Sequence, residues 1–127
     1  RNYQARNFLR DEIAEGDGVL FYHSNTKIPA IVGLAQVVRS GYPDFTAFDP
    51  TEKHFDPKSD PQNPTWYMVD VRYLCHLPFP LDRDFLRSHP VLAGMAVLKK
   101  GNRLSVQPVS AEQWRAVLEV AGIEEPF

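Results

Sequence analysis

Residues 66–77, with the sequence WYMVDVRYLCHL, carry the clearest strand pattern in this chain. Aromatic and branched residues dominate the run, and successive side chains of a strand point to opposite faces. One face is almost entirely apolar, so the pattern predicts a long, half-buried β-strand. That face holds Tyr67, Val69, Val71, Tyr73, Cys75 and Leu77, and the other holds Met68, Asp70, Arg72, Leu74 and His76.

Two apolar runs predict earlier strands over residues 18–24 and 31–39. The second run is apolar on both faces apart from Gln36, which predicts a central position in the sheet. Its Gly33 indicates a bend or a close backbone approach, as barrels need. Residues 96–99 and 103–109 flank Lys100-Gly101-Asn102 and predict a hairpin.

Three helices are predicted, over residues 3–13, over residues 81–89 and after Ser110. Asp82 begins the second helix and Pro90 ends it. Ser110 and Gln113 form a capping box at the start of the third, which ends at Gly122. The chain is therefore predicted to be α+β, with five or so strands suited to a small β-barrel and short flanking helices.

The 127 residues predict one domain, with 43% hydrophobic residues and a formal net charge of −2. A single cysteine excludes an internal disulfide and favours a reducing, cytoplasmic compartment. No apolar run reaches the roughly 18 residues that a membrane-spanning helix needs. The chain starts at Arg1 rather than at methionine, so we expect a fragment or a processed chain.

Residues 41–64 form a long irregular connection that contains five of the eleven prolines, and the charges between Gly41 and Thr65 sum to −3. A loop of more than about 15 residues in a compact domain is usually functional or mobile. Outside this connection the chain carries a net charge of +1, which is compatible with a modest basic face. Proteins that bind long nucleic acids by charge alone are usually strongly basic, so the net charge of −2 argues against that class.

No metal or cofactor site is predicted. The four histidines are dispersed, and Cys75 has no partner cysteine at ligand spacing. Phosphate-binding and dinucleotide-binding glycine motifs are absent. Cys75 and His76 are adjacent in a predicted strand, so their side chains point to opposite faces and cannot form a dyad.

Polar and aromatic side chains gather at three places that a base-binding pocket could use. Amides offer paired donors and acceptors, and aromatic rings stack on a base. The same residues could instead be helix caps and solvated strand positions. They are Asn2, Gln4, Arg6 and Asn7 in the first helix, Tyr22, His23, Ser24 and Asn25 at the first strand end, and Arg103, Ser105 and Gln107 in the last strand.

Five motifs in order resemble the EVE domain family. They are RNYQARN at residues 1–7, FYHSN at 21–25, IVGLA at 31–35, YPD at 42–44 and RLSVQPV at 103–109. The resemblance implies a single PUA-like domain over residues 1–127, a barrel of five to six strands. It also implies a non-enzymatic reader of DNA or RNA that holds a modified base, particularly a modified cytosine. Separately, we expect a monomer.

The family usually begins with a short strand that this sequence lacks, so an unpaired strand edge is expected. From the resemblance we expect a base pocket formed by residues of all three polar groups and an aromatic pair before the central strand. The pocket residues are Asn2, Tyr3, Arg6, Asn7, Tyr22, His23, Ser24, Trp66, Tyr67, Ser105 and Gln107. The expected phosphate-binding residues are Arg1, Arg10 and Arg103, with Arg6 able to assist.

Two alternatives remain open at this point. A hydrolase acting on a modified nucleoside or a related small molecule would use His23, Ser24 and either Asp70 or Asp44. A protein-interaction module would instead present its proline-rich loop as an exposed apolar patch, formed by Phe45, Phe48 and Phe55.

Overall fold

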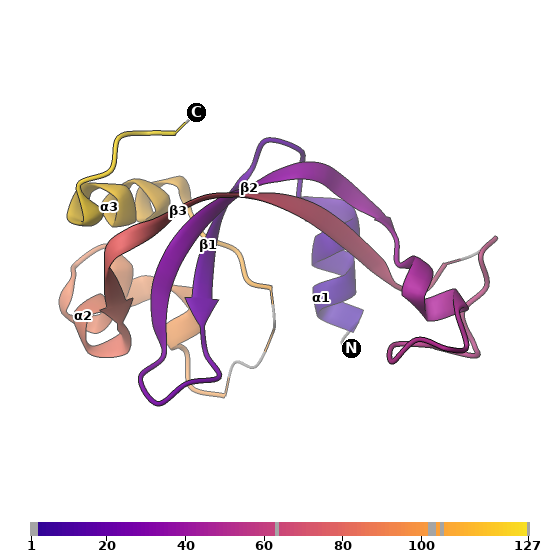
Figure 1. Ribbon diagram of the computed structural model, residues 1–127. Coiled ribbons are helices and arrows are strands. Elements are labelled where there is room, and N and C mark those ends of the chain that lie inside the picture. The colour runs from indigo at the N-terminus through magenta and orange to yellow at the C-terminus, as the bar shows by residue number, and fades with distance from the viewer. Residues whose placement is uncertain (1–2, 63, 102–103, 105, 127) are drawn as a thin grey trace.

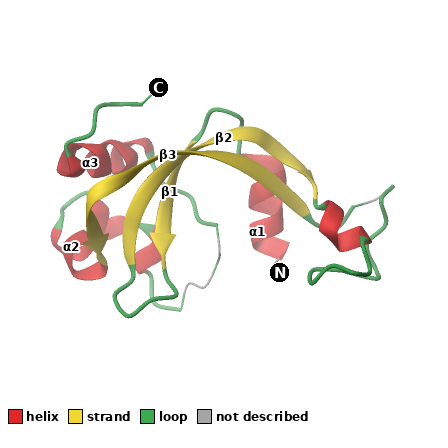
Figure 2. Cartoon of the chain, in the orientation of Figure 1, coloured by secondary structure: helices red, strands yellow, loops and turns green. Residues whose placement is uncertain are grey.

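The computed structural model describes residues 3–62, 64–101, 104 and 106–126. Its sheet has three antiparallel strands in the order β1-β2-β3 (Figures 1 and 2). They are β1 (Gly18–His23), β2 (Ala30–Pro43) and β3 (Tyr67–Asp82). The apolar run at 31–39 is the central strand, as its two apolar faces predicted.

β2 and β3 curve together into an arch, and β1 lies along only one half of it (Figure 1). β1 pairs with β2 from Gly18 opposite Gln36 to His23 opposite Ala30. β3 pairs with the whole of β2, from Asp82 opposite Ala30 to Tyr67 opposite Pro43. One half of the arch is thus three strands wide, and the other half is a two-stranded ribbon.

Helices pack at both ends of the arch. α2 (Arg83–Ser88) and α3 (Ala111–Ala121) close the three-stranded end, together with the short turns η3 (Leu92–Gly94) and η4 (Ala96–Leu98). α1 (Tyr3–Asn7), continued by the wider helical turn η1 (Phe8–Glu12), lies under the ribbon (Figure 1). The 3-10 turn η2 (Phe45–Phe48) follows β2.

The apolar core lies at the three-stranded end, between the sheet and the C-terminal helices. The residues of this core that are at most 1% exposed are Ile31, Leu34, Leu81, Leu86, Leu92 and Val117. Burying a Leu, Ile or Val side chain stabilises the fold by about 1.5–3 kcal/mol, so this end holds most of the stabilising contacts.

The helix ends follow the capping signals in the sequence. The Asp82 carboxylate accepts from the Phe85 amide at 2.9 Å and begins α2. Ser110 and Gln113 exchange both bonds of the capping box, and Gly122 ends α3 with a left-handed φ of 70°. These three predictions are confirmed, because side-chain caps and a glycine C-terminus act locally.

β3 runs five residues further than the predicted strand, through Pro78 and Pro80 to Asp82. Proline has no N–H to donate, and a strand tolerates it only where that position faces away from a neighbour. β3 is an edge strand in the described part of the chain, and its prolines lie where the ladder with β2 is interrupted, between the pairs Gly33–His76 and Ile31–Leu81.

The hairpin predicted at residues 96–99 and 103–109 is wrong. Residues 96–98 form a 3-10 turn, in which the Leu98 and Lys99 amides donate to the Met95 and Ala96 carbonyls. These short-range bonds satisfy the backbone without a partner strand. Of residues 103–109, the described ones (104 and 106–109) lie outside any strand.

The predicted barrel of five to six strands is therefore not confirmed. The described residues form a small α+β domain with an open antiparallel sheet and short helices. None of the helices in that part of the chain is long and apolar enough to cross a bilayer.

Gly41 lets η1 press against the ribbon half of the arch. A Cβ built on Gly41 would overlap the Leu9 carbonyl oxygen and lie 3.0 Å from Arg10 Cα. Both are backbone atoms, which cannot move without displacing the whole helical segment. The contact holds η1 in place against β2.

We therefore expect Gly41→Ala to lower the free energy of unfolding by about 1–3 kcal/mol, the usual cost of overpacking. Gly94→Ala is the matched control, because its added Cβ would meet only the flexible Gln113 Nε2, at 3.9 Å. Urea denaturation of both variants measures the difference. Equal stability of the two variants would contradict the close packing at Gly41.

Candidate functional site

A hollow of about 300 Å³ opens at the three-stranded half of the sheet. It lies where the strand pairing is irregular, and bulges of this kind often occur beside binding sites. Its lining is mostly aromatic and apolar, with two imidazoles. We name it the ring-lined hollow; its residues are Phe21, Tyr22, His23, Val32, Gly33, Tyr73 and His76.

Two register shifts shape the ring-lined hollow. On β2, Ile31 and Gly33 face Tyr22 and Phe21, so Val32 is the extra residue of a bulge. On β3, Cys75 and Tyr73 face consecutive residues of β2, which makes Leu74 the extra residue. A bulge breaks the strict alternation of side chains along a strand, so residues at both odd and even positions can line one hollow.

Tyr73 and His76 show the effect of the β3 bulge. Strict alternation assigns them to opposite faces, yet the Tyr73 hydroxyl lies 2.6 Å from His76 Nδ1. Their ring centroids are 5.3 Å apart. The sequence prediction missed both residues because strand periodicity contains no signal for a bulge. This pair gives the hollow a polar group between aromatic walls.

The predicted residues at the end of β1 reach the hollow in part. Tyr22 and His23 line it, whereas Ser24 lies exposed in the bend that follows β1. The Tyr22 ring packs against the core, and its hydroxyl is buried with no hydrogen-bond partner among the described residues. The structure places Tyr22 and His23 at the same hollow, and their base-binding role stays a prediction.

Gly33 brings β2 and β3 close together at the floor of the hollow. A Cβ there would lie 3.2 Å from the Cys75 carbonyl oxygen. The close approach predicted for this glycine is therefore confirmed. Cys75 itself is half-buried beside the core, and its thiol forms no disulfide.

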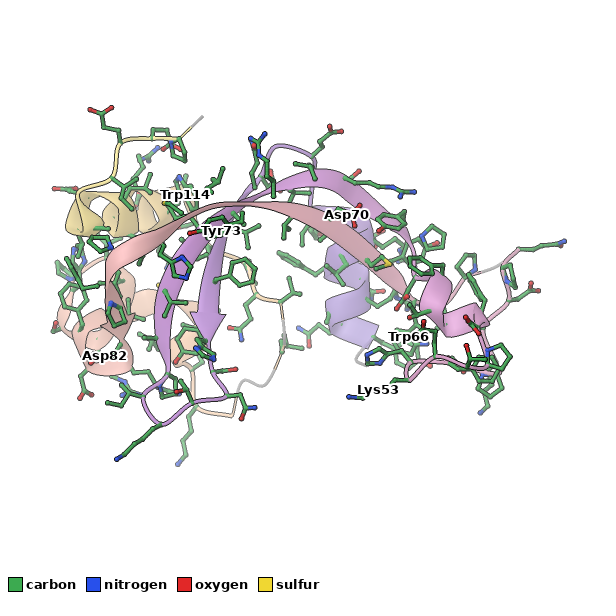
Figure 3. The ribbon with its side chains drawn as sticks, in the orientation of Figure 1. Lys53, Trp66, Asp70, Tyr73, Asp82 and Trp114 are labelled. Atoms are coloured by element: carbon green, nitrogen blue, oxygen red, sulfur yellow. The ribbon has the colours of Figure 1, made fainter. Side chains whose placement is uncertain are left out.

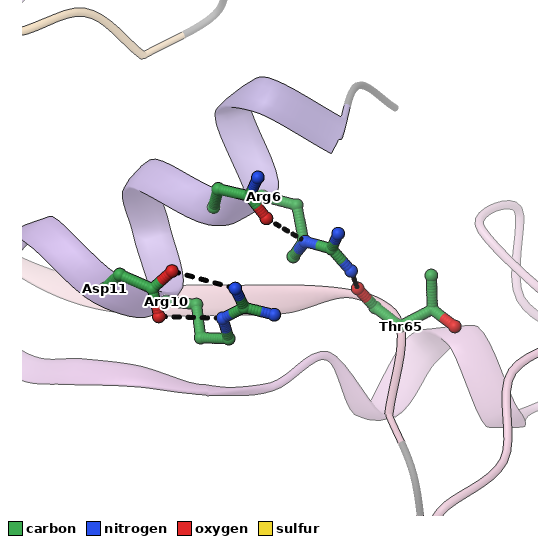
Figure 4. A network of polar contacts seen from close by, with 5 residues as sticks. Arg6, Arg10, Asp11 and Thr65 are labelled. Carbon is green, nitrogen blue, oxygen red and sulfur yellow. Dashed lines mark hydrogen bonds and ion pairs between the residues drawn. The ribbon is translucent and has the colours of Figure 1, made fainter.

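A second group of predicted residues meets at the far end of the arch, where α1 approaches the start of β3. The Tyr3 and Trp66 rings stack with centroids 5.1 Å apart and planes 20° from parallel. Arg6 donates from Nη1 to the Thr65 carbonyl at 2.8 Å (Figure 4). Its guanidinium lies 5.2 Å from the Tyr3 ring centroid. We name Tyr3, Arg6, Thr65 and Trp66 the Trp66 cluster.

The proline-rich connection is tied to this cluster. Trp66 donates from Nε1 to the Asp56 carboxylate at 2.6 Å. Beside this bond lies a shallower hollow of about 320 Å³, lined by Lys53, His54, Phe55, Asp56 and Trp66. Rings, a carboxylate and two cationic or titratable side chains therefore share this surface.

Arg10 and Asp11 form a two-pronged ion pair, with nitrogen–oxygen distances of 2.7 and 2.8 Å (Figure 4). The hydrogen bond from Arg10 holds the pKa of the Asp11 carboxyl below its usual range. Arg10 also lies 5.9 Å from the centroid of the Tyr67 ring. Arg6 Nε donates to Asn7 Oδ1 at 2.6 Å, so Asn7 is engaged within its own helix.

The remaining predicted site residues are only partly described. The Gln107 amide donates to the Leu104 carbonyl at 2.8 Å and so binds its own loop. The predicted pocket residues Asn2 and Ser105 and the predicted phosphate contacts Arg1 and Arg103 lie outside the described residues.

The structure thus divides the predicted pocket residues between two places. Tyr73, at the ring-lined hollow, and Trp66 lie over different halves of the arch (Figure 3). Tyr22 and His23 belong to the first place, and Tyr3, Arg6 and Trp66 to the second. A site that uses both must contact its ligand at two points.

The hydrolytic alternative gains no support from this arrangement. Asp70 accepts from the Tyr42 hydroxyl, and Asp44 accepts from the Thr46 amide and hydroxyl. Among the described residues, neither carboxylate orients His23, as a general base would require. No group of three or more potential metal ligands occurs in this part of the chain either.

Phe45 and Phe55 are 61% and 39% exposed, and Phe48 is half-buried. A protein-interaction module would expose all three rings. Two of them, Phe45 and Phe55, are exposed, so this alternative is supported in part.

The family model for the EVE domain matches residues 1–120 of the chain. The chain belongs to the EVE domain family. Thymocyte nuclear protein 1 of Danio rerio is 42% identical over 135 residues, and that of Homo sapiens is 40% identical over 127. These matches cover 100% and 94% of this EVE domain and 57% and 56% of the relatives, so the chain spans about half of their length.

Solved structures share the fold of this EVE domain. A hypothetical protein from Leishmania major has a TM-score of 0.85 at 47% identity, covering 96% of this chain and 76% of its own. The human THYN1 protein in complex with 5-methylcytosine-containing DNA has a TM-score of 0.84 at 40% identity. That match covers 98% of this chain and 77% of the human one.

A tyrosine–carboxylate bond braces the ribbon half of the EVE domain. Tyr42 donates to Asp70 at 2.6 Å, and this bond, with desolvation and the Asp70 charge, raises the pKa of the Tyr42 phenol. The Arg39 guanidinium lies 3.5 Å from the centroid of the Tyr42 ring, and its positive charge acts to lower the pKa of the phenol.

A folded-state pKa above the unfolded value of about 10 stabilises the fold below that pH, and this contribution is lost as pH rises through the folded pKa. Tyr42→Phe should therefore lower stability at neutral pH, and the deficit should shrink in strongly alkaline solution. The ultraviolet absorbance of the unchanged protein minus that of Tyr42→Phe reports the ionisation of Tyr42. We expect that ionisation above about pH 10, the ordinary pKa of tyrosine. Ionisation at or below that value would contradict the assignment.

Proposed function

We propose that this EVE domain binds DNA and holds one modified cytosine in the ring-lined hollow. The observation that carries the proposal is a hollow of about 300 Å³ walled by aromatic rings in the described part of the chain. Support from outside the chain comes from the human THYN1 protein, whose structure contains 5-methylcytosine DNA. The proposal is a binding function, with no bond made or broken.

The size and lining of the hollow suit a single pyrimidine. A drug-sized site is about 300–1,000 Å³ and mainly apolar, with a few polar groups that fix orientation. Phe21 and Tyr73 are 47% and 58% exposed, so their rings are open to stacking. Val32 offers apolar contact to a methyl group on the base, and the Tyr73–His76 pair can bond to the base edge.

A base must leave the duplex stack to enter the hollow. That step costs a few kcal/mol, and less for single-stranded or damaged sites. Stacking on an aromatic side chain returns about 1–3 kcal/mol per base. The cost and the gain are comparable, so contacts elsewhere on the DNA are needed for useful affinity.

The Trp66 cluster supplies such contacts. Tyr3 is 62% exposed at the start of α1, and Arg6 lies beside its ring. Lys53 and His54 flank Trp66 across the shallow hollow. Aromatic rings interleaved with cations bind nucleic acid with little sequence preference. Arg10 can contribute less, because Asp11 already neutralises it.

The proposal predicts tighter binding of an oligonucleotide with one 5-methylcytosine than of the same sequence with cytosine. Phe21→Ala should weaken binding of the modified strand by about 5- to 150-fold, because it removes one stacking wall. Fluorescence anisotropy with both oligonucleotides, single- and double-stranded, measures this. An RNA strand carrying the same base distinguishes the nucleic acid preferred.

Phe79→Ala is the matched control for Phe21→Ala. Phe79 is 46% exposed, compared with 47% for Phe21, and it lies on the same sheet outside the hollow. The control should bind as the unchanged protein does. Equal losses in both variants, or equal affinity for modified and unmodified DNA, would argue against the hollow as a base site.

Lys53, which lines the shallow hollow beside Trp66, should contribute to binding without regard to the modification. Lys53→Ala should weaken modified and unmodified DNA by the same factor, and it should reduce the slope of log K against log salt by about 1. Titrations at several salt concentrations measure the slope. A selective loss for the modified strand would instead place the base beside Trp66.

A further inference from the structure

Trp66 is held by the proline-rich connection at two points. The Asp44 amide donates to the Trp66 carbonyl at 2.8 Å, which fixes the backbone. The indole Nε1–H donates to Asp56 Oδ2 at 2.6 Å, which fixes the ring. Hydrogen bonds to an ionised partner are roughly twice as strong as neutral ones. The orientation of the indole therefore depends on this carboxylate as well as on its stack with Tyr3.

Asp56 is itself fixed within the connection. Its Oδ1 accepts from the Lys58 amide at 3.0 Å, and its own amide donates to the carbonyl of the fully buried Ala47 at 3.0 Å. Pro57 follows Asp56, and an aspartate before a proline is typical of a tight turn. The two carboxylate oxygens thus have different roles, because Oδ1 caps the turn and Oδ2 holds the ring.

The place of Asp56 is unexpected for a surface that binds DNA. Its side chain lines the shallow hollow together with Lys53, His54 and Trp66. By charge alone a carboxylate repels phosphate groups, so removing it should tighten DNA binding. The bond to Trp66 gives the same carboxylate an effect of opposite sign, because it holds a ring that can stack on a base. The sign of the change in affinity therefore tells the two effects apart.

We propose that Asp56 is a positioning residue of the DNA interface, which holds the Trp66 indole in the orientation that stacks on the nucleic acid. The inference rests on the proposed DNA binding and deepens it. Trp66 contacts the DNA, and Asp56 acts through Trp66. Because Trp66 and Tyr73, at the ring-lined hollow, lie over different halves of the arch, Asp56 affects modified and unmodified DNA alike (Figure 3).

Asp56→Ala should weaken binding of the 5-methylcytosine and the cytosine oligonucleotide by the same factor. We expect a factor of about 3 to 10, since the variant removes one hydrogen bond to the ring. Fluorescence anisotropy with both oligonucleotides measures the two affinities. Tighter binding, which charge alone predicts, would overturn the proposal.

Asp60→Ala is the matched control. Asp60 Oδ1 accepts from the Gln62 amide at 2.9 Å, so this variant removes the same charge and the same kind of turn bond from the same connection. It should bind DNA as tightly as the unchanged protein or slightly more tightly. A loss equal to that of Asp56→Ala would assign the effect to the turns of the connection and contradict the positioning role.

A double-mutant cycle with Trp66→Phe tests whether Asp56 acts through the ring. Phenylalanine keeps an aromatic face but has no N–H, so the bond to Oδ2 is lost while Oδ1 can still cap the turn. Asp56→Ala should therefore cause no further loss of affinity in the Trp66→Phe protein. A full, additive loss in that protein would make Asp56 a structural residue of the connection and would refute the proposal.

Tryptophan fluorescence gives a readout that needs no DNA. The chain has two tryptophans, so Trp114→Phe leaves Trp66 as the single emitter. In this protein Asp56→Ala should increase the quenching of Trp66 by acrylamide, and Asp60→Ala should not. Equal quenching in both variants would mean that Asp56 does not hold the ring. Circular dichroism and urea unfolding show whether each variant is folded.

The outcomes separate this inference from the proposed function. Absence of DNA binding up to millimolar concentration would overturn both. If the unchanged protein binds DNA and prefers 5-methylcytosine, while Asp56→Ala and Asp60→Ala bind alike, only the positioning role of Asp56 fails.

Discussion

The irregular pairing of β2 with its two neighbours is the constraint on which the rest of the structure depends. In the described part of the chain, both ladders share β2, and its pairing shifts register at several points. Each shift bends the strands and increases their twist, which explains the arch. The same shifts gather residues of both strand parities around one hollow. Regular pairing would give a flatter sheet without that hollow.

The two halves of the arch differ in how they are stabilised. The three-stranded half is packed against α2 and α3 by large apolar side chains that are almost fully buried. The ribbon half depends on close backbone contact at Gly41 and on polar and stacking contacts around Tyr42 and Trp66. Hydrogen bonds and exposed ring pairs stabilise less than core burial does. We therefore expect the ribbon half to open first under denaturing conditions, as the less stable unit.

A chain with a net charge of −2 is a poor general ligand for DNA, and its surface chemistry agrees with recognition of a few groups. Arg10 is neutralised by Asp11, and Arg6 is partly occupied by the Thr65 carbonyl. Three aromatic side chains, Tyr3, Phe21 and Tyr73, are well exposed. Stacking depends less on salt than phosphate contacts do, so we expect the proposed DNA binding to depend more on the base than on the backbone.

The sequence by itself determined the elements whose signals are local. The strand runs, the caps at Asp82 and Ser110, the glycine end of α3 and the family membership were all readable from it, because neighbouring residues carry each signal. It also singled out Gly33 as a point of close approach.

Only the tertiary structure decided how these elements meet. Bulges at Val32 and Leu74 depend on the partner strand, so periodicity could not place Tyr73 beside His76. Residues 96–98 had an apolar pattern typical of a strand, but their backbone is satisfied by short-range bonds. The split of the predicted pocket between Tyr22 and Trp66 likewise follows from the length and curvature of the arch, which only long-range pairing sets.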